Sequence, residues 1–474
     1  MTGIQPLVLW TDLLLFGLLA CTLIAGWSVR RSEPMRAAWR RVGESSVGMT
    51  SLTVLMVFLL VGLMDSLHYR ERLAPAGGEQ LAADDRRQLS TEVRSALDAL
   101  AAPLRTRVEK TYSAPLAYQL FARQTVEGPD GSQKREFPRL KHGGADLKYP
   151  EHELDGDIVG RIGMGLAVAA VAWIVFAAVL VKVVAMSRRV PAGAAWRAIW
   201  RGKGGPAWRA VLATLGVMLL LIGPLAALAT EYHVFGTDKV GQDVLFLTLK
   251  SIRTALVIGT LTTLVTLPLA VALGIMAGYL GGWVDDVIQY IYTVLNSIPG
   301  VLLIAAAVLM MQVVIDTHPE WFETAAERAD ARLLALCLIL GMTSWTGLCR
   351  LLRGETLKLR ELEYVQAARA FGVSTTRILA RHVLPNLMHL VLIALVMDFS
   401  GLVLAEAVLS YVGIGVDPGT VSFGTMINAA RMELAREPMV WWSLVAAFIF
   451  MFVLVLAANL FADVVRDAFD PRAS

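Results

Sequence analysis

Two carboxylates stand inside one long apolar run and are the side chains best placed to handle charge or protons. Asp398 and Glu406 fall within the run from Leu387 to Leu409, which is long enough to cross a bilayer as a helix. They lie roughly two turns apart, on broadly the same half of such a helix. A charge in a span usually lines a path through the membrane or bonds to a neighbouring helix or subunit. Bonding to a neighbour is favoured, especially for Glu406, near the outer end of the run.

A second pair of carboxylates, Asp238 and Asp243, flanks a turn at Gly241. General acid–base chemistry would place such a pair beside a reacting group. Neither a nucleophile nor a metal ligand accompanies these two residues. We therefore expect them to cap backbone N–H groups of the turn and to contact another protein.

Further patterns argue against an enzyme or a metalloprotein. The glycine-rich stretch from Gly413 to Gly419 lacks the lysine and the following helix of a phosphate-binding loop. The cysteines and the scattered histidines have no metal-ligand spacing; they are Cys21, Cys337, Cys349, His68, His142 and His152. We predict no catalytic residue, no metal site and no cofactor bound by this chain.

The composition indicates an all-α integral membrane protein. Of 474 residues, 56% are hydrophobic and only 18% are charged, which is typical of a chain that crosses a membrane several times. The net charge of +3 is too small to favour nucleic acid as a partner.

The apolar runs predict three spans, an insert and a six-span core. The first three spans are Leu7 to Ala25, Val47 to Met64 and Ile162 to Met186. The core runs are Val211 to Thr230, Ala255 to Ala277, Val287 to Val314, Leu333 to Cys349, Leu387 to Leu409 and Trp441 to Ala462. The corresponding regions are 1–64, the insert 65–160, 161–207 with the third span and a basic loop, and the core 208–474. In the insert we expect helix from Leu89 to Leu120, interrupted by Pro103 and Pro115, and loop from Gly128 to Gly144.

Basic residues predict the orientation of these spans. Arginines from Arg30 to Arg41, and a basic cluster from Arg188 to Arg209 that includes Lys203, would lie in the cytoplasm by the positive-inside rule. The N-terminus and the insert would then lie outside and the C-terminus inside. The second cluster would also touch anionic lipid head groups.

One core run contains a proline that would bend its helix. Pro299 follows Asn296 and Ser297 inside the run from Val287 to Val314. Proline frees a backbone carbonyl, which nearby polar groups can satisfy. A kink at a gate and a bent packing helix are about equally favoured.

A short polar stretch from Tyr364 to Pro385 separates two core runs and predicts a helix–turn–helix elbow. As a helix, its first part places Tyr364, Ala367, Ala368 and Phe371 on one face, and Gln366 and Arg369 elsewhere. Gly372 would end that helix. Ser374 would cap a second short helix with Ile378, Leu379 and Val383 on its apolar side, and Pro385 would begin the next. Such an elbow, on the basic and therefore cytoplasmic side, suits insertion into a cleft on another protein.

The elbow resembles the EAA loop of ATP-binding-cassette importer permeases, on Gln366-Ala367-Ala368, Gly372 and Leu384-Pro385. Other motifs resemble the "C" subunits of dipeptide and oligopeptide permeases, from about Trp208 onward. They are Phe235 to Asp238 with Gly241 to Val244, Ala277 to Asp285, Ala405 to Val416, and Arg466 to Arg472. Two residues depart from the family pattern: Gln366 replaces the usual Glu, and Gln242 the usual Arg. Each retains hydrogen bonding and loses a charge.

The resemblance implies a permease subunit of the bacterial inner membrane that imports di- or oligopeptides or related solutes. Its implied partners are a homologous permease, two cytoplasmic ATPase subunits that use ATP and Mg, and an extracytoplasmic solute-binding protein. The elbow would couple this chain to the ATPases through Tyr364, Gln366, Ala367, Ala368, Arg369, Phe371, Gly372, Arg377, Leu384 and Pro385. The translocation path would involve Asp398, Glu406, Asn296, Ser297 and Pro299, and the binding protein would contact Asp238, Asp243, Gly413 and Gly415. The alternative is a proton-coupled secondary carrier that uses Asp398 or Glu406.

Overall fold

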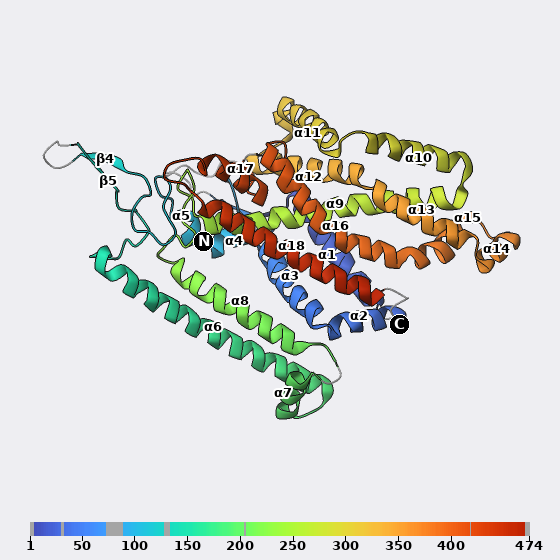
Figure 1. The fold of residues 1–474 in the computed structure, drawn as a ribbon, viewed down its shortest axis with the longest axis horizontal. Coiled ribbons are helices and arrows are strands. Elements are labelled where there is room, and N and C mark those ends of the chain that lie inside the picture. Colours follow the sequence, from blue (N-terminus) through green and yellow to red (C-terminus); the bar gives the residue numbers. More distant parts are fainter. Residues whose placement is uncertain are drawn as a thin grey trace, which may run out of the picture.

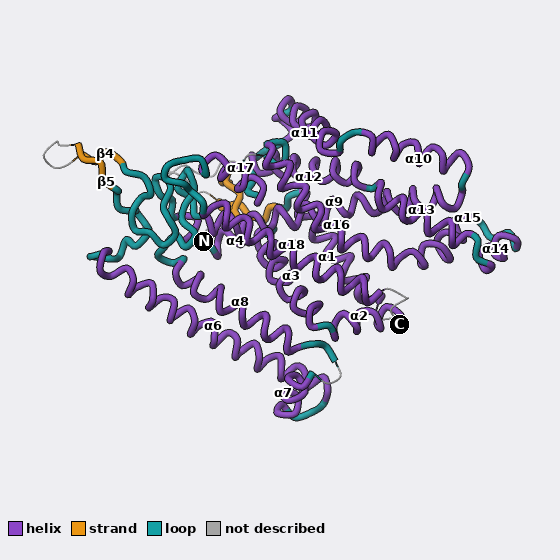
Figure 2. Tube along the Cα trace, in the orientation of Figure 1, coloured by secondary structure: helices purple, strands orange, loops and turns teal. Residues whose placement is uncertain are grey.

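Long apolar helices make up most of the molecule, as the apolar runs predict (Figures 1 and 2). The structure, a computed structural model, describes residues 4–29, 33–72, 89–127, 133–202, 205–417 and 419–469. Within these residues, 8 helices are long and apolar enough to cross a membrane. A shorter apolar helix, Trp10–Ile24, occupies the first predicted span. The expectation of an all-α membrane protein is confirmed.

The elements before the core are three N-terminal helices, a mostly irregular insert and a helical hairpin. They are β1 (Ile4–Leu7), α1 (Trp10–Val29), α2 (Glu33–Glu44), α3 (Ser46–Asp65), β2 (His68–Arg72), β3 (Leu89–Ser95), α4 (Ala96–Leu100), α5 (Ala102–Thr106), β4 (Gln124–Glu127), β5 (Gln133–Glu136), α6 (Pro150–Arg188), α7 (Ala192–Arg201) and α8 (Trp208–Leu228). Strands β1, β2 and β3 form an antiparallel sheet, and β4 pairs with β5 in a hairpin.

The core elements follow a central helix, α9. They are α9 (Val244–Leu280), α10 (Gly282–Ser297), α11 (Gly300–Thr317), a 3₁₀ turn (Pro319–Trp321), α12 (Ala325–Ser344), α13 (Thr346–Arg360), α14 (Glu363–Ala370), α15 (Thr375–Ile378), a π-helical turn (Leu379–Val383), α16 (Leu384–Val412), α17 (Phe423–Glu433) and α18 (Trp442–Phe469).

The predicted single span from Val287 to Val314 is wrong. The structure divides it into α10 and α11, with Ile298 in an extended conformation (φ −93°, ψ 132°) between them. Proline disfavours helix in the residue before it and lacks an N–H. Pro299 therefore breaks the helix, where we expected a bend.

The predicted helix from Leu89 to Leu120 is also largely wrong. Its first seven residues form β3, which pairs with β2, and only the short helices α4 and α5 follow. Thr91 and Val93 are β-branched residues that favour a strand. Part of the predicted loop from Gly128 to Gly144 is the strand β5, while 128–132 lie outside the described residues.

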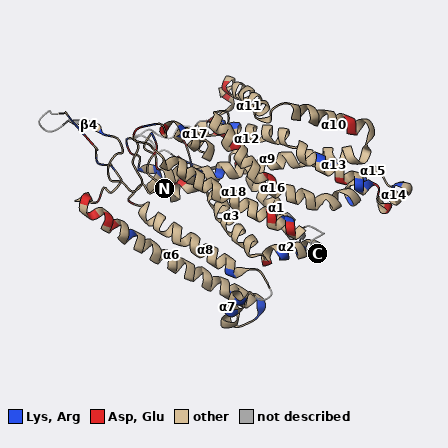
Figure 3. Ribbon diagram, viewed as in Figure 1, with Lys and Arg blue, Asp and Glu red and all other residues tan. Residues whose placement is uncertain are grey.

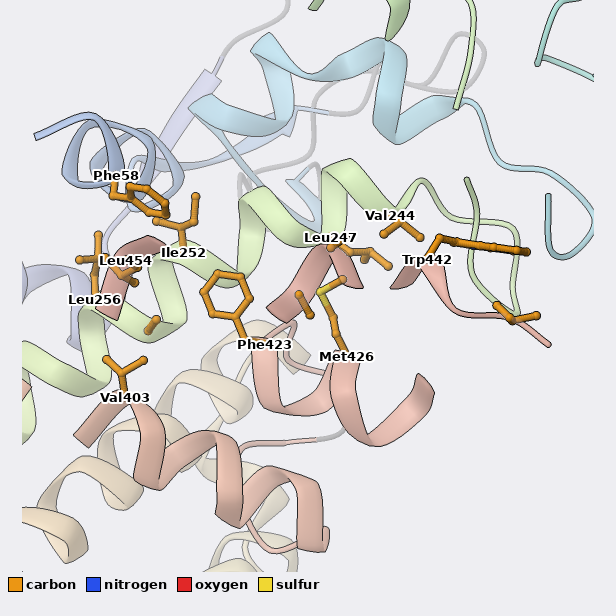
Figure 4. Close-up of a cluster of buried hydrophobic side chains, with 14 of the residues drawn as sticks. Phe58, Val244, Leu247, Ile252, Leu256, Val403, Phe423, Met426, Trp442 and Leu454 are labelled. Atoms are coloured by element: carbon orange, nitrogen blue, oxygen red, sulfur yellow. The ribbon is translucent and has the colours of Figure 1, made fainter. Parts of the chain in front are cut away.

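A buried cluster joins the N-terminal helices to the core. Phe58 of α3 packs with Ile252 of α9, Phe423 of α17 and Leu454 of α18 (Figure 4). Helix α9 thus packs both with the N-terminal helix α3 and with the core helices α17 and α18. Because burial of apolar side chains drives this packing, α3 is part of the same folded body as the core.

The two ends of the bundle differ in structure and charge. The insert strands, α17 and the start of α6 lie at one end, and α14, α15, α2 and α7 lie toward the other (Figure 1). Lysine and arginine gather on α7 and around α13 and α15 (Figure 3). This separation agrees with the predicted alternation of spans, and the assignment of one end to the cytoplasm stays a prediction. Arg30, Arg31 and Lys203, on which that assignment partly rests, lie outside the described residues.

Helices α9 and α13 approach closely at two glycines that the sequence analysis missed. A Cβ on Gly274 would lie 2.8 Å from the carbonyl oxygen of Cys349, and one on Gly278 would lie 2.6 Å from Cβ of Thr356. The spacing of four residues is that of the G-x-x-x-G pattern, which lets membrane helices pack backbone to backbone.

We therefore expect Gly278→Ala to destabilise the chain by about 1–3 kcal/mol, because the added methyl overpacks the contact with α13. The measurement is thermal unfolding of the purified chain in detergent. Gly354→Ala on α13 is the matched control, because a Cβ there meets nothing within 4 Å. It should be neutral or slightly stabilising, and equal behaviour of the two variants would refute the close-packing argument.

Candidate functional site

The elbow between α13 and α16 is anchored by a few buried apolar side chains. Val365, Ile378, Val383 and Leu387 are each at most 1% exposed, in a cluster that includes Leu348 and Leu352 of α13. Burial of Ile378 and Val383 confirms the predicted apolar side of the second helix. Val365, the buried anchor of α14, was not predicted. The helical face expected from the sequence contained Tyr364, Ala367 and Phe371 and did not include Val365.

The opposite side of the elbow is exposed. Ala368 is half-buried, whereas Tyr364, Gln366, Ala367 and Arg369 are exposed. Phe371 is 89% exposed, which is unusual for so large an apolar side chain unless another surface covers it. The elbow thus presents small side chains and one bare phenyl ring.

Gly372 turns the chain after α14. Its φ is +76°, and a Cβ there would meet nothing within 4 Å. Glycine is needed at this position for its backbone conformation, and the space around it is open in the isolated chain. The predicted helix end at Gly372 is confirmed, with Phe371 as the C-cap of α14.

The second half of the elbow continues directly into the span. Ser374 holds the N-cap position of α15, but its side chain makes no capping hydrogen bond. The helix then widens into the π-helical turn and passes into α16, with Pro385 in the first turn of α16. The expected separate helix before Pro385 is wrong: the N–H of Leu384 donates to the carbonyl oxygen of Leu379, so the π-helical turn continues directly into α16. Arg377 and Pro385 are exposed and Leu384 is half-buried.

Hydrogen bonds hold the elbow from within the chain. Gln366 Nε2 donates to the backbone oxygen of Glu361 (3.2 Å) and to its Oε2 (3.3 Å). Asn386 Nδ2 donates to the Tyr364 hydroxyl at 3.1 Å. The amide of Gln366 thus makes a bond to a carboxylate that a glutamate at the same position could not make without a proton.

An ion pair fixes α13, and with it the elbow, to the start of α10. Arg353 donates from Nε to Asp285 Oδ1 (2.6 Å) and from Nη2 to Asp285 Oδ2 (2.7 Å), the bidentate geometry of a strong arginine–carboxylate pair. Arg360 also donates to the backbone oxygen of Tyr279 at 3.3 Å. Asp285 ends the motif that begins at Ala277, in a stretch whose only charges are acidic, and this isolated acidic charge was the available signal.

The two carboxylates of α16 have different surroundings. Glu406 is 1% exposed and accepts hydrogen bonds from Ser410 Oγ (2.6 Å) and Ser422 Oγ (2.8 Å). Ser422 is the N-cap of α17, so Glu406 ties α16 to the loop before α17. Asp398 is half-buried and makes no hydrogen bond or ion pair with the residues described. The structure therefore does not bring the two residues into one site.

The residues expected along a path beside Pro299 lie on an open surface. Asn296, Ser297 and Pro299 are exposed at the junction of α10 and α11. Asn296 Oδ1 accepts a hydrogen bond from Thr346 Oγ1 at 3.2 Å. The junction of α10 and α11 thus exposes both polar side chains, Asn296 and Ser297, and the apolar ring of Pro299.

The residues expected to contact a binding protein divide into buried and accessible ones. Asp238 is half-buried and accepts from the N–H groups of Val240 (3.0 Å) and Gln242 (2.8 Å). Gly413 is exposed and ends α16 with φ +87°. Asp243 and Gly415 are buried, so a direct contact of these two with another protein is not possible in this conformation.

Asp243 instead caps α9 and belongs to a buried ionic network. Its Oδ1 accepts from the N–H of Leu245 (2.8 Å) and of Phe246 (3.2 Å), as predicted for a capping residue. His233 Nδ1 lies 2.8 Å from Asp243 Oδ2, and its Nε2 lies 3.5 Å from Glu109 Oε1 of the insert. The latter is an ion-pair distance without hydrogen-bond geometry.

The charges of His233 and Glu109 in this network are stabilised by their surroundings. Burial would lower the pKa of His233, but the carboxylates of Asp243 and Glu109 outweigh it and raise the pKa to about 9. Burial would raise the pKa of Glu109, but His233 and the backbone N–H groups of 141–143 lower it to about 2. The imidazolium thus joins the insert to the start of the core.

Two cations of α9 bind carboxylates from the N-terminal part of the chain and from α12. Arg253 Nη2 lies 2.6 Å from Asp12 Oδ1 and 3.7 Å from Asp330 Oδ1 of α12. Lys250 Nζ lies 2.7 Å from Asp65 Oδ1 and 3.1 Å from Asp98 Oδ1. None of these pairs was predicted from the sequence, although a lone charge in an apolar run is a signal that a partner is required.

Comparison with known proteins agrees with the arrangement of the core. Residues 270–474 match the model of the family described as "Binding-protein-dependent transport system inner membrane component". The relatives include three that are similar over about half of this chain. The dipeptide transport system permease protein of Lactococcus lactis is 33% identical over 244 residues, which are 52% of this chain and 65% of the relative. The oligopeptide transport system permease protein of Mycobacterium bovis is 34% identical over 241 residues, 51% of this chain and 76% of the relative. The glutathione transport system permease protein of Pectobacterium atrosepticum is 31% identical over 240 residues, 51% of this chain and 73% of the relative.

The His233 network predicts a pH dependence for docking of the insert. Because the pKa of His233 is raised to about 9, its stabilisation is fully present below about pH 6.5 and is lost as the pH rises through about 9. Because the pKa of Glu109 is lowered to about 2, its stabilisation is present above about pH 4.5 and is lost as the pH falls toward about 2.

We expect cleavage of the insert by a protease active in alkali to accelerate between about pH 7 and pH 10.5, after correction for the enzyme's own pH profile. His233→Gln, which cannot carry the charge, is the control and should be cleaved at the fast rate throughout. A wild-type rate that does not change over this interval would contradict the assignment.

Proposed function

This chain belongs to the family of binding-protein-dependent transport system inner membrane components, and from that premise we propose that it is the membrane-spanning permease subunit of an ATP-driven importer. The solutes proposed are di- or oligopeptides or related small molecules, by analogy with the named transport systems of its relatives. The proposed location is the bacterial inner membrane, with the C-terminus and the elbow in the cytoplasm.

The observation that carries the proposal is the elbow of α14 and α15. It combines a buried anchor, Val365, with an exposed tip at Ala367, Phe371 and Gly372. An exposed phenyl ring flanked by small side chains fits a pocket on a partner, because such aromatic anchors carry much of the binding energy of interfaces. The proposed partner at this tip is one of the two ATPase subunits of the importer, which hold ATP and Mg.

Energy would reach this chain as a displacement of the elbow. A partner can shift the balance between inward-open and outward-open states only by contacts that differ between the two states. The elbow is suited to transmit such a shift because its anchor packs against α13 and its other end is continuous with α16. No ATPase site is proposed on this chain, which acts as a transport subunit and not as an enzyme.

The proposed path lies between this chain and a homologous permease. Asp398 is the residue proposed to face it, because it is half-buried in a span without a partner among the described side chains. The exposed junction at Asn296 and Pro299 would border the same path. The proposed surface for a solute-binding protein lies at the other end of the bundle, around Asp238, Gly413 and α17.

We expect Phe371→Ala to reduce recovery of the ATPase subunits with the tagged chain by about tenfold or more, because it removes the anchor at the tip. The measurement is purification in mild detergent followed by quantitative mass spectrometry. Stability should change by less than about 0.5 kcal/mol, since the ring is exposed.

Met432→Ala is the matched control, because Met432 is 71% exposed on α17 at the opposite end, and it should retain the ATPases. If both variants retain undiminished ATPase subunits, the exposed tip is not the site where the ATPases bind.

Gly372→Val, which strains a left-handed residue, should abolish uptake and leave membrane insertion intact.

Asp398 also supports the second candidate, a proton-coupled carrier. The two mechanisms differ in what collapse of the proton gradient does when ATP is held constant. In reconstituted vesicles we expect uptake to persist with a protonophore and to require ATP. Uptake that stops with the protonophore, and no longer responds to it in Asp398→Asn, would establish the carrier and overturn the importer.

A further inference from the structure

A groove of about 970 Å³ runs between α6 and α7, at the end of the helical hairpin. Its lining is mainly apolar and includes Trp173, Val181 and Trp196. Two cations, Lys182 and Arg189, also line it, and no Asp or Glu does so in the described chain. The groove therefore combines an apolar trough with positive charge.

Helix α7 forms one wall because it folds back on α6. The chain reverses at Arg189, which has φ +52°. Ala195 and Ile199 of α7 are then buried against Ala177 and Val184 of α6. Helix α7 exposes Trp196, which lines the groove, and Trp200 together with arginines, the pattern of a short helix at the interface between lipid and water.

Lys182 is the residue that points to a ligand. It lies in the apolar part of α6, a helix that is long and apolar enough to cross a membrane. Its side chain is exposed and makes no hydrogen bond or ion pair with any residue that the structure describes. A cation at such a position is costly in hydrocarbon unless it reaches an anion at the interface.

Arg189 offers a second positive group on the same side. It is the C-cap residue directly after α6, and its side chain lines the same groove as that of Lys182. Arg189 is also exposed and has no partner among the described side chains. A phosphate at the end of the trough can contact both groups, since long basic side chains extend toward the membrane surface.

We propose that this groove is a binding site for one anionic phospholipid. The phosphodiester lies between Lys182 and Arg189, and an acyl chain occupies the trough beside Trp173 and Val181. The amphipathic ring of Trp196 lies at the level of the head group, where tryptophan is favoured. Two cations without a carboxylate favour an anionic head group over a zwitterionic one, whose ammonium they would repel.

The test measures lipid binding by the full-length chain with native mass spectrometry in detergent. Phosphatidylglycerol is the probe and phosphatidylcholine of the same chain length is the comparison. The double variant Lys182→Gln/Arg189→Gln should bind phosphatidylglycerol roughly thirtyfold more weakly. Its binding of phosphatidylcholine should not change.

Arg197→Gln is the matched control, because Arg197 is exposed on α7 but does not line the groove. It should retain wild-type affinity for phosphatidylglycerol. Ala178→Trp keeps both cations and fills the trough, and it should also lose the lipid. If the double variant fails to fold, Ala178→Trp still tests whether the groove binds the lipid.

Equal affinity of the wild type for the two lipids would overturn the proposal. So would wild-type affinity for phosphatidylglycerol in Ala178→Trp. If the isolated complex instead shows a crosslink from position 182 to another protein subunit, the groove is a protein interface and the lipid assignment is wrong.

Discussion

The buried guanidinium of Arg253 imposes the constraint on which the rest of the structure depends. Only 11% of its side chain is exposed, and it sits on the central helix α9. An unpaired charge there would cost several kcal/mol, so carboxylates must surround it. They come from two separate parts of the chain, Asp12 in α1 and Asp330 in α12. One helical turn earlier on α9, Lys250 forms ion pairs with Asp65 and Asp98 in the same way. The N-terminal helices and the insert are therefore held to the core by charge neutralisation as well as by the apolar cluster around Phe58.

Local features of the sequence predicted much of the fold and failed where distant partners decide. Hydropathy identified most of the spans, because each apolar run must be buried in lipid or protein whatever its neighbours. It could not show that Pro299 divides one run into α10 and α11. Periodicity around Leu89 suggested helix, yet β3 forms because β2 offers an edge to pair with. The Arg253 pairs could not be assigned at all, since Asp12 and Asp330 reach it only in the folded chain.

The candidate sites show the same limit. Gly372 was identified correctly because a left-handed residue depends mainly on glycine itself. Asp398 and Glu406 have nearly the same sequence context, and only the structure separates them: Ser410 and Ser422 satisfy Glu406, and Asp398 has no partner among the described residues. Asp243 and Gly415 carry recognisable motifs and are nevertheless buried. A motif thus indicates that a residue matters to the family fold, without indicating whether its side chain meets another protein.

The π-helical turn at Leu379–Val383 has a mechanical consequence. Because the helix is not interrupted at Pro385, residues Thr375 to Val412 form one rod of about 57 Å. Its ends are the turn at Gly372 and the loop that Glu406 fastens to α17. Such a rod acts as a lever: a tilt of about 5° at one end displaces the other by about 5 Å. The π-helical turn interrupts the regular α-helical hydrogen-bond pattern of this rod between the elbow and the span, and such turns inside α-helices are frequent at functional sites.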